Sequence, residues 1–112
     1  MEEQAFDDGR YMDSFQIIAY AGDAKSLAHM AVEAARKFDF IAAKERLEEA
    51  ELEMRKAHQL QISMIQKEAQ GEHLSVDIIL VHAQDHLAMA MMAKESADEL
   101  VMVYQILHNL MK

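Results

Sequence analysis

No proline occurs in the 112 residues, and glycine occurs only at Gly9, Gly22 and Gly71. Proline and glycine are the residues that normally interrupt helices, because proline lacks a backbone donor and glycine costs about 1 kcal/mol relative to alanine. Most other positions carry the helix-favouring residues Ala, Leu, Met, Glu, Lys and Gln. The sequence therefore predicts an all-α protein, and its length fits a single domain over 1–112.

Helical spacing of apolar residues predicts three helices, over about 14–37, 40–69 and 75–111. The first break lies at Phe38-Asp39-Phe40, where the Asp39 carboxylate is suited to cap the second helix. The second break contains Gly71, and Ser75 is the expected cap of the third helix. Short connections favour antiparallel neighbours, so we expect a three-helix bundle from which the long third helix projects.

The second helix is amphipathic, and the third helix carries more apolar residues than one bundle can cover. The predicted inward stripe of the second helix is Ala43, Leu47, Ala50, Met54, Ala57, Gln61 and Ile65. One seam of the third helix is Val76, Ile79, Ala83, Ala90, Ala97, Tyr104 and Met111, and a second seam is Ile78, His82, Asp85, Met89 and Met92.

The second seam predicts a homo-oligomer. A helix that is apolar nearly all round is normally buried on all sides, and two sister helices cannot cover every side. The alternatives are a methionine-rich face left partly in water and a promiscuous binding surface, since ten methionines occur in the chain.

Charge and composition argue against several classes of function. The chain has no cysteine, which removes disulfides, thiolate metal sites and cysteine nucleophiles. A formal net charge of -9 opposes binding to nucleic acid and to anionic membrane surfaces. No apolar run approaches the roughly 20 residues that span a bilayer, and the N-terminus is acidic where a secretory signal would be basic. We therefore expect a cytoplasmic protein without direct membrane insertion.

The stretch VHAQDHL in the third helix places polar side chains in an apolar belt. His82, Asp85 and His86 stand at positions i, i+3 and i+4, so they project from adjoining sectors of one helical surface. This cluster is compatible with a metal site, with a nucleophilic histidine that takes up and releases a phosphoryl group, or with a polar network that fixes oligomer register. Spacing alone does not rank these three uses.

Several segments resemble one family over about residues 15–104. They are Gly22-Asp23-Ala24-Lys25-Ser26-Leu27-Ala28, Asp39-Phe40, Glu49-Ala50, Ala57-His58, Ile65-Gln66-Lys67-Glu68-Ala69, VHAQDHL and Ala93-Lys94-Glu95. Together they resemble the IIA component of the lactose/cellobiose (including chitobiose) family of bacterial sugar phosphotransferase systems. VHAQDHL is the specific part, whereas the alanine and glutamate positions elsewhere would match many helical proteins.

The resemblance implies a phosphotransferase component with a phosphohistidine intermediate. It implies a homotrimer of three-helix bundles, in which His82 accepts a phosphoryl group from the phosphocarrier protein HPr and passes it to a cysteine of the IIB component. The alternative function is a non-catalytic helical metal-binding or adaptor oligomer.

Three neighbours of His82 are expected to take part, Asp85 as the resemblance implies, and His86 and Gln84 because of their positions around the helix. Asp85 faces its symmetry mates on the trimer axis, where a divalent cation, magnesium, is shared by the three carboxylates, and oxygen ligands suit such a hard cation. His86 and Gln84 are expected to support the phosphate. Gln84 points about 200° away from His82 around the helix, so it would reach a neighbouring subunit more easily.

The chain departs from the family at one place near the site. After the second histidine the family commonly reads Leu-Met-Thr, whereas this chain has Leu87-Ala88-Met89, which bears on how the seam packs. Four further histidines lie outside the cluster and are expected to be surface or hydrogen-bonded residues; they are His29, His58, His73 and His108.

Overall fold

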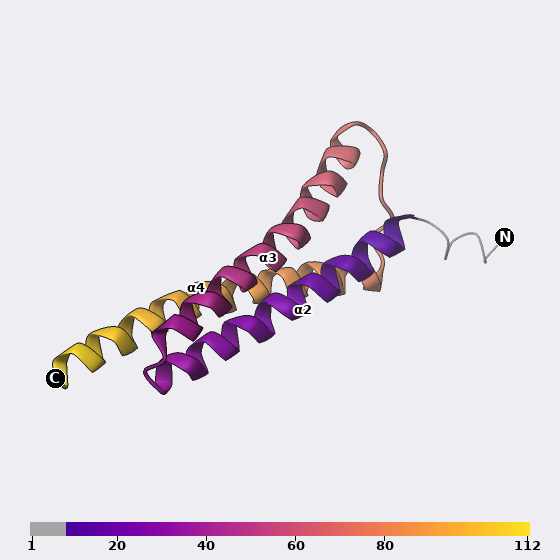
Figure 1. Ribbon diagram of the computed structural model, residues 1–112. Coiled ribbons are helices and arrows are strands. Elements are labelled where there is room, and N and C mark those ends of the chain that lie inside the picture. Colours follow the sequence, from indigo (N-terminus) through magenta and orange to yellow (C-terminus); the bar gives the residue numbers. More distant parts are fainter. Residues whose placement is uncertain (1–8) are drawn as a thin grey trace.

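The computed structural model describes residues 9–112, which form three long helices and no strand (Figure 1). Helix α2 spans Gly9–Arg36, α3 spans Phe40–Ala69 and α4 spans Ile78–Leu110. The all-α prediction is confirmed, and the predicted bounds of α3 agree with the structure. Helix α2 begins earlier than residue 14, and α4 begins three residues later than residue 75.

The three helices form an up-down-up bundle in which α2 lies against both partners. Ile17 packs with Ala83 and Leu87, and further along α2 Ala31 packs with Val101, so α2 and α4 run in the same direction. Helix α3 runs the opposite way, and its C-terminal half leans away from the other two helices (Figure 1). The molecule extends over 66 × 25 × 18 Å, and the end of α4 projects beyond its partners as expected.

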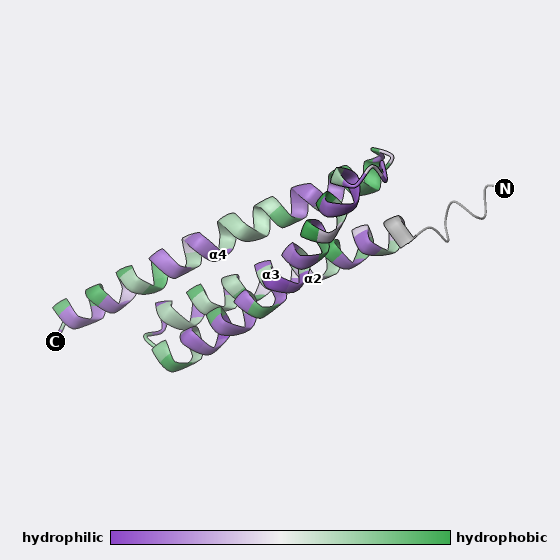
Figure 2. Cartoon of the chain, turned by 90° about the horizontal axis from the view of Figure 1, so that it is seen from above, coloured by the Kyte–Doolittle hydropathy of each residue, from purple (hydrophilic) through white to green (hydrophobic). Residues whose placement is uncertain are grey.

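Alanine dominates the core and lets the helices approach closely. Because alanine has only one side-chain carbon, a stripe of alanines brings helix backbones together without a cavity between them. Hydrophobic residues also recur along α4 outside this core (Figure 2). The buried alanines are Ala21, Ala24, Ala28, Ala31 and Ala35 in α2, Ala43, Ala50 and Ala57 in α3, and Ala83, Ala90 and Ala97 in α4.

The inward stripe of α3 differs from the predicted one at its end. Met64 is buried, whereas Ile65 is 59% exposed. The predicted stripe moved to residue 65 after Gln61, but spacing of three and four residues from Ala57 continues to Met64. The end of α3 diverges from α4 (Figure 1), and Ile65 stays largely exposed among residues 9–112.

The turn between α2 and α3 confirms Asp39 as a helix cap. The Asp39 carboxylate accepts a hydrogen bond from the backbone N–H of Ala42 at 3.1 Å. Before it, Phe38 has a φ of 63°, which is left-handed backbone that L residues rarely adopt. The N–H groups of Phe38 and Asp39 donate to the carbonyls of Ala35 and Ala34, which closes the end of α2.

The second connection contains the expected glycine but a different cap. Gly71 has a φ of 96°, and the N–H groups of Gly71 and Glu72 donate to the last carbonyls of α3. The cap of α4 is Asp77, whose carboxylate accepts from the N–H of Leu80 at 2.9 Å, so the prediction of Ser75 was wrong. Both residue types cap helices well, and the two positions are separated by a single residue.

One ion pair joins α4 to α3. The Lys94 ammonium lies 2.9 Å from an Asp98 carboxylate oxygen and 3.5 Å from Glu51 on α3. The Lys94 side chain is only 12% exposed, so these carboxylates satisfy a largely covered charge. Within residues 9–112, none of the helices is both long enough and apolar enough to cross a bilayer.

Candidate functional site

The residues of the VHAQDHL stretch lie in the first turns of α4, where His82 is the fifth helical residue. His82 and Asp85 are exposed and His86 is half-buried. Ala83 and Leu87 of the same stretch are buried against α2 and α3. The helix therefore turns Ala83 and Leu87 inward and presents His82 and Asp85 outward, with His86 between them partly covered.

The two histidines of this stretch contact each other. Their Nε2 atoms lie 3.1 Å apart, and the ring centroids are 4.5 Å apart with the planes nearly perpendicular. As a hydrogen bond, this contact needs one ring nitrogen that carries a proton and one that accepts, and which ring donates depends on the two tautomers. The geometry leaves Nδ1 of His82 facing away from His86, and the exposed ring is open to a partner.

Asp85 extends from the same face without a hydrogen bond or an ion pair to any residue of the range 9–112. A divalent cation needs several oxygen ligands, and residues 9–112 contain no group of three acidic or histidine side chains that could hold one. Asp85 therefore fits a cation only where further copies of the chain bring their own carboxylates to the same place.

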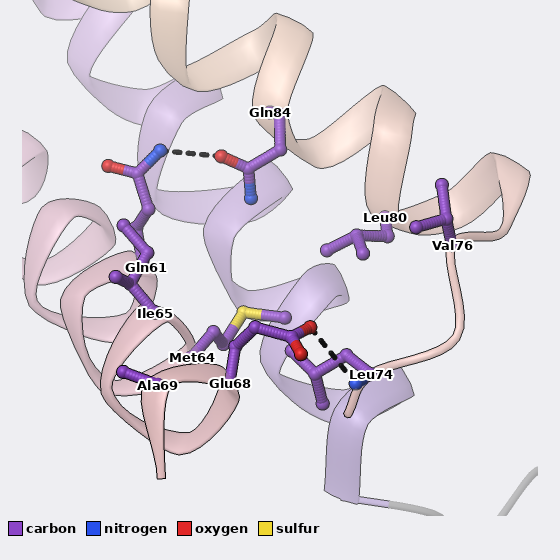
Figure 3. Close-up of a pocket in the computed structure, with 9 residues that line it drawn as sticks. All are labelled: Gln61, Met64, Ile65, Glu68, Ala69, Leu74, Val76, Leu80 and Gln84. Atoms are coloured by element: carbon purple, nitrogen blue, oxygen red, sulfur yellow. Dashed lines mark hydrogen bonds between the residues drawn. The ribbon is translucent and has the colours of Figure 1, made fainter. Parts of the chain in front are cut away.

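Gln84 points to the opposite side of α4 from His82. Its side-chain oxygen accepts a hydrogen bond from the Gln61 amide of α3, so within one chain it is directed toward α3 (Figure 3). The predicted separation of Gln84 from His82 agrees with this placement. Gln61 was expected only as a member of the inward stripe, and nothing in its spacing indicated that it would pair with Gln84.

The start of α4 lies closer to His82 than the sequence predicted. The predicted start at about residue 75 would put His82 about two turns inside the helix, but α4 begins at Ile78, which leaves little more than one turn. Two of the first N–H groups are already bonded, since Leu80 donates to the Asp77 side chain and Val81 donates to the Asp77 carbonyl. These two groups are therefore not open to an anion at His82.

Apolar side chains surround the polar cluster on the outer face of α4 and are not covered by the chain. The exposed fractions are 80% for Ile78, 47% for Val81, 45% for Met89 and 69% for Met92. The second seam predicted from the sequence is thus exposed in the single chain. Patches of this kind normally mark contact surfaces.

The other four histidines lie away from the cluster, as expected. His29 and His58 are exposed on α2 and α3. His73 contacts the Glu68 carboxylate, and His108 packs between two aromatic rings, with its centroid 4.7 Å from Phe38 and 5.7 Å from Phe40.

Fold and site together define a three-helix bundle protein that presents an exposed histidine, paired with a half-buried one, near the start of its last helix. The family described as "PTS system, Lactose/Cellobiose specific IIA subunit" matches residues 12–105. The chain therefore belongs to the lactose/cellobiose IIA family of the sugar phosphotransferase system, and the resemblance seen in the sequence is confirmed.

Individual relatives agree with this assignment. The chain is 42% identical over 91 residues to the lichenan-specific phosphotransferase enzyme IIA component of Bacillus subtilis, covering 81% of this chain and 83% of that protein. The crystal structure of the cellobiose-specific enzyme IIA from Bacillus anthracis is 36% identical with a TM-score of 0.86, covering 88% and 90%. The IIA(Chitobiose)–HPr complex of Escherichia coli is 33% identical with a TM-score of 0.76, covering 87% and 94%.

Proposed function

We propose that this chain is a cytoplasmic phosphoryl carrier of a sugar-uptake phosphotransferase system. It accepts a phosphoryl group from HPr on His82 and passes it to a cysteine of the cognate IIB component. The observation that carries the proposal is the exposed His82 imidazole, held against His86 on an uncovered face of α4. Membership of the IIA family supports it, and so does the solved complex of a relative with HPr.

The chemical step is an exchange of bonds at phosphorus. A ring nitrogen of neutral His82 uses its lone pair to form a bond to phosphorus, while the bond from phosphorus to HPr breaks and its electron pair returns to HPr. In the second half, the thiolate of the IIB cysteine forms the new bond and His82 leaves with the electron pair. Phosphoryl transfer depends mainly on positioning and on stabilising charge, which an exposed and oriented imidazole can provide.

His86 orients the ring and supports the charge on the phosphoryl group. In the tautomer in which His86 donates, Nε2 of His82 is unprotonated and its lone pair accepts the bond from His86, so that bond must be released before this nitrogen attacks phosphorus. After transfer, the same His86 N–H can bond a phosphoryl oxygen, and such charge-assisted bonds are stronger than neutral ones. Gln84 is a second supporting residue, which would act toward the phosphoryl group of a neighbouring subunit because it lies on the far side of α4 from its own His82.

The working form is a homotrimer in which the exposed seam of α4 packs against the same seam of two further copies. Burial of Ile78, Val81, Met89 and Met92 would supply the apolar contact that the single chain leaves open. Three copies of Asp85 would then meet in that seam. A shared magnesium ion would neutralise the mutual repulsion of these carboxylates, and the carboxylate oxygens suit it.

The proposal is tested by incubating the protein with enzyme I, HPr and phosphoenolpyruvate and measuring its intact mass. We expect an acid-labile gain of one phosphoryl group in the wild type and none in His82→Ala. His58→Ala is the matched control, since His58 is also exposed but makes no hydrogen bond or ion pair within residues 9–112, and this variant should be phosphorylated normally. No mass gain in the wild type would instead favour a metal-binding or adaptor oligomer, whose binding would depend on Asp85 and the exposed seam.

A further inference from the structure

Residues 70–77 connect α3 to α4 and determine where the helix that carries His82 begins. The connection turns at Gly71 and ends at Asp77, which caps α4 five residues before His82. Because His82 lies only about one turn inside the helix, any fraying of the first turn would reach it. The position of the connection is therefore linked directly to the position of the imidazole.

Glu68, in the last turn of α3, holds the middle of this connection. One of its carboxylate oxygens accepts from the backbone N–H of Leu74 at 3.3 Å, as Figure 3 shows, and the other contacts Nδ1 of His73. The hydrogen bond from His73, with a smaller contribution from the Leu74 N–H, lowers the pKa of Glu68. The carboxylate is therefore charged at neutral pH, and both contacts are present there.

Packing alone holds this part of the chain weakly. A cavity of about 390 Å³ lies between the end of α3, the connection and the start of α4 (Figure 3); its lining includes Met64, Leu74 and Leu80. Leu74 packs against the core cluster around Ile17, but Val76 is 81% exposed. Because this pocket is open to solvent, its apolar lining is left uncovered on that side, so burial stabilises the connection less there. The contacts of Glu68 are then more consequential than those of an ordinary exposed ion pair.

We infer that Glu68 is a positioning residue for His82, which it serves by fastening the connection that sets the start of α4. This role rests on the phosphoryl-carrier function proposed above. Glu68 does not touch the reacting atoms. It fixes Leu74, and through the short run from Leu74 to Asp77 it fixes the first turn of α4 and the direction in which His82 and His86 point.

The test compares Glu68→Ala with Glu72→Ala, a matched change of an exposed glutamate within the connection whose side chain makes no hydrogen bond or ion pair within residues 9–112. The first measurement is the single-turnover rate of phosphoryl transfer from phospho-HPr at several HPr concentrations. We expect Glu68→Ala to be about 3-fold to 10-fold slower at saturation, with the half-saturating HPr concentration unchanged. Glu72→Ala should transfer at the wild-type rate.

The second measurement is amide hydrogen exchange. In Glu68→Ala the amides of residues 74–81 should exchange faster, while those in the middle of α2 stay protected, which shows that the bundle remains folded. Glu68→Gln retains an oxygen that can accept from the Leu74 N–H, so it should recover much of both the rate and the protection. Recovery by this conservative variant separates the loss of a specific acceptor from a general loss of stability.

Two outcomes would overturn the inference while leaving the carrier function in place. In the first, Glu68→Ala transfers the phosphoryl group at the wild-type rate although the amides of residues 74–81 exchange faster. In the second, amide hydrogen exchange in residues 74–81 is unchanged in Glu68→Ala. A wild-type chain that accepts no phosphoryl group would instead overturn the carrier function and the positioning role together. The wild-type reaction thus distinguishes the two failures.

Discussion

The Nε2 atoms of His82 and His86 lie 3.1 Å apart across one turn of α4, with the His82 ring exposed and the His86 ring half-buried. Because the two rings differ in exposure, we expect these two chemically identical side chains to have different roles in phosphoryl transfer. The exposed ring can meet a partner protein, whereas the half-buried ring is better placed to hold and orient it. Removing each ring should therefore have a different effect.

We expect His86→Ala to slow phosphoryl uptake from HPr by about 10-fold to 100-fold, because a hydrogen bond to a charged group contributes about 1.5–3 kcal/mol. His86→Gln retains an N–H donor and should lose less. Both variants are compared with the wild type by the initial rate of mass gain in the presence of enzyme I, HPr and phosphoenolpyruvate. Uptake by His86→Ala at the wild-type rate would show that His86 takes no part in orienting the ring or binding the phosphate.

Asp85→Leu should leave the trimer intact or strengthen it. In the proposed trimer three like charges are brought together in an apolar seam, and replacing buried charges by apolar side chains is often neutral or stabilising. Sedimentation velocity over a dilution series measures the effect, with Glu45→Leu as the control that removes one exposed carboxylate from α3. Dissociation of Asp85→Leu to monomers would contradict the placement of Asp85 on the axis.

The helices and the outward cluster were predictable from the sequence because both depend on local periodicity. The surplus of apolar residues around His82 likewise indicates an uncovered face, and Gly71 marks the end of α3 correctly. The start of α4 was missed because Ser75 and Asp77 are comparable caps in local terms. In the structure Leu74 and Leu80, on either side of Asp77, pack against the core, and local cap preference contains no information about such tertiary contacts.

The partner of Gln84 could not be predicted for a related reason. Helical spacing gives the direction of its side chain relative to His82, but not what lies in that direction. Its bond to Gln61 depends on the angle between α3 and α4 and on how far α3 leans away. Such angles follow from the packing of residues that are distant in the sequence. The periodicity of a single helix gives no information about that packing.

Ala31→Leu should destabilise the bundle by about 1–3 kcal/mol. Ala31 is 0% exposed within the alanine stripe of α2 and packs in the cluster with Val101, so added carbons must push the helix backbones apart or adopt strained rotamers. Ala19→Leu, at an exposed position of the same helix, should change stability little. Urea denaturation at a fixed protein concentration measures both, and equal midpoints for the two variants would mean that close packing of α2 is not required.

Phe38 and His108 should show a measurable energetic coupling. The left-handed backbone at Phe38 costs about 1–2 kcal/mol, which glycine would relieve. Against this, the Phe38 ring packs 4.7 Å from the His108 ring, and aromatic pairs contribute about 0.5–1.5 kcal/mol beyond burial.

The free energy change caused by Phe38→Gly should therefore be more favourable in a His108→Ala background, where the Phe38 ring keeps Phe40 but has lost His108 and the backbone relief remains. The expected coupling is about 0.5–1.5 kcal/mol in a double-mutant cycle measured by urea denaturation. The aromatic contact, rather than chance, would then explain why a non-glycine residue is retained at this left-handed position. Additive effects of the two substitutions would show instead that the His108 ring does not stabilise the turn through Phe38.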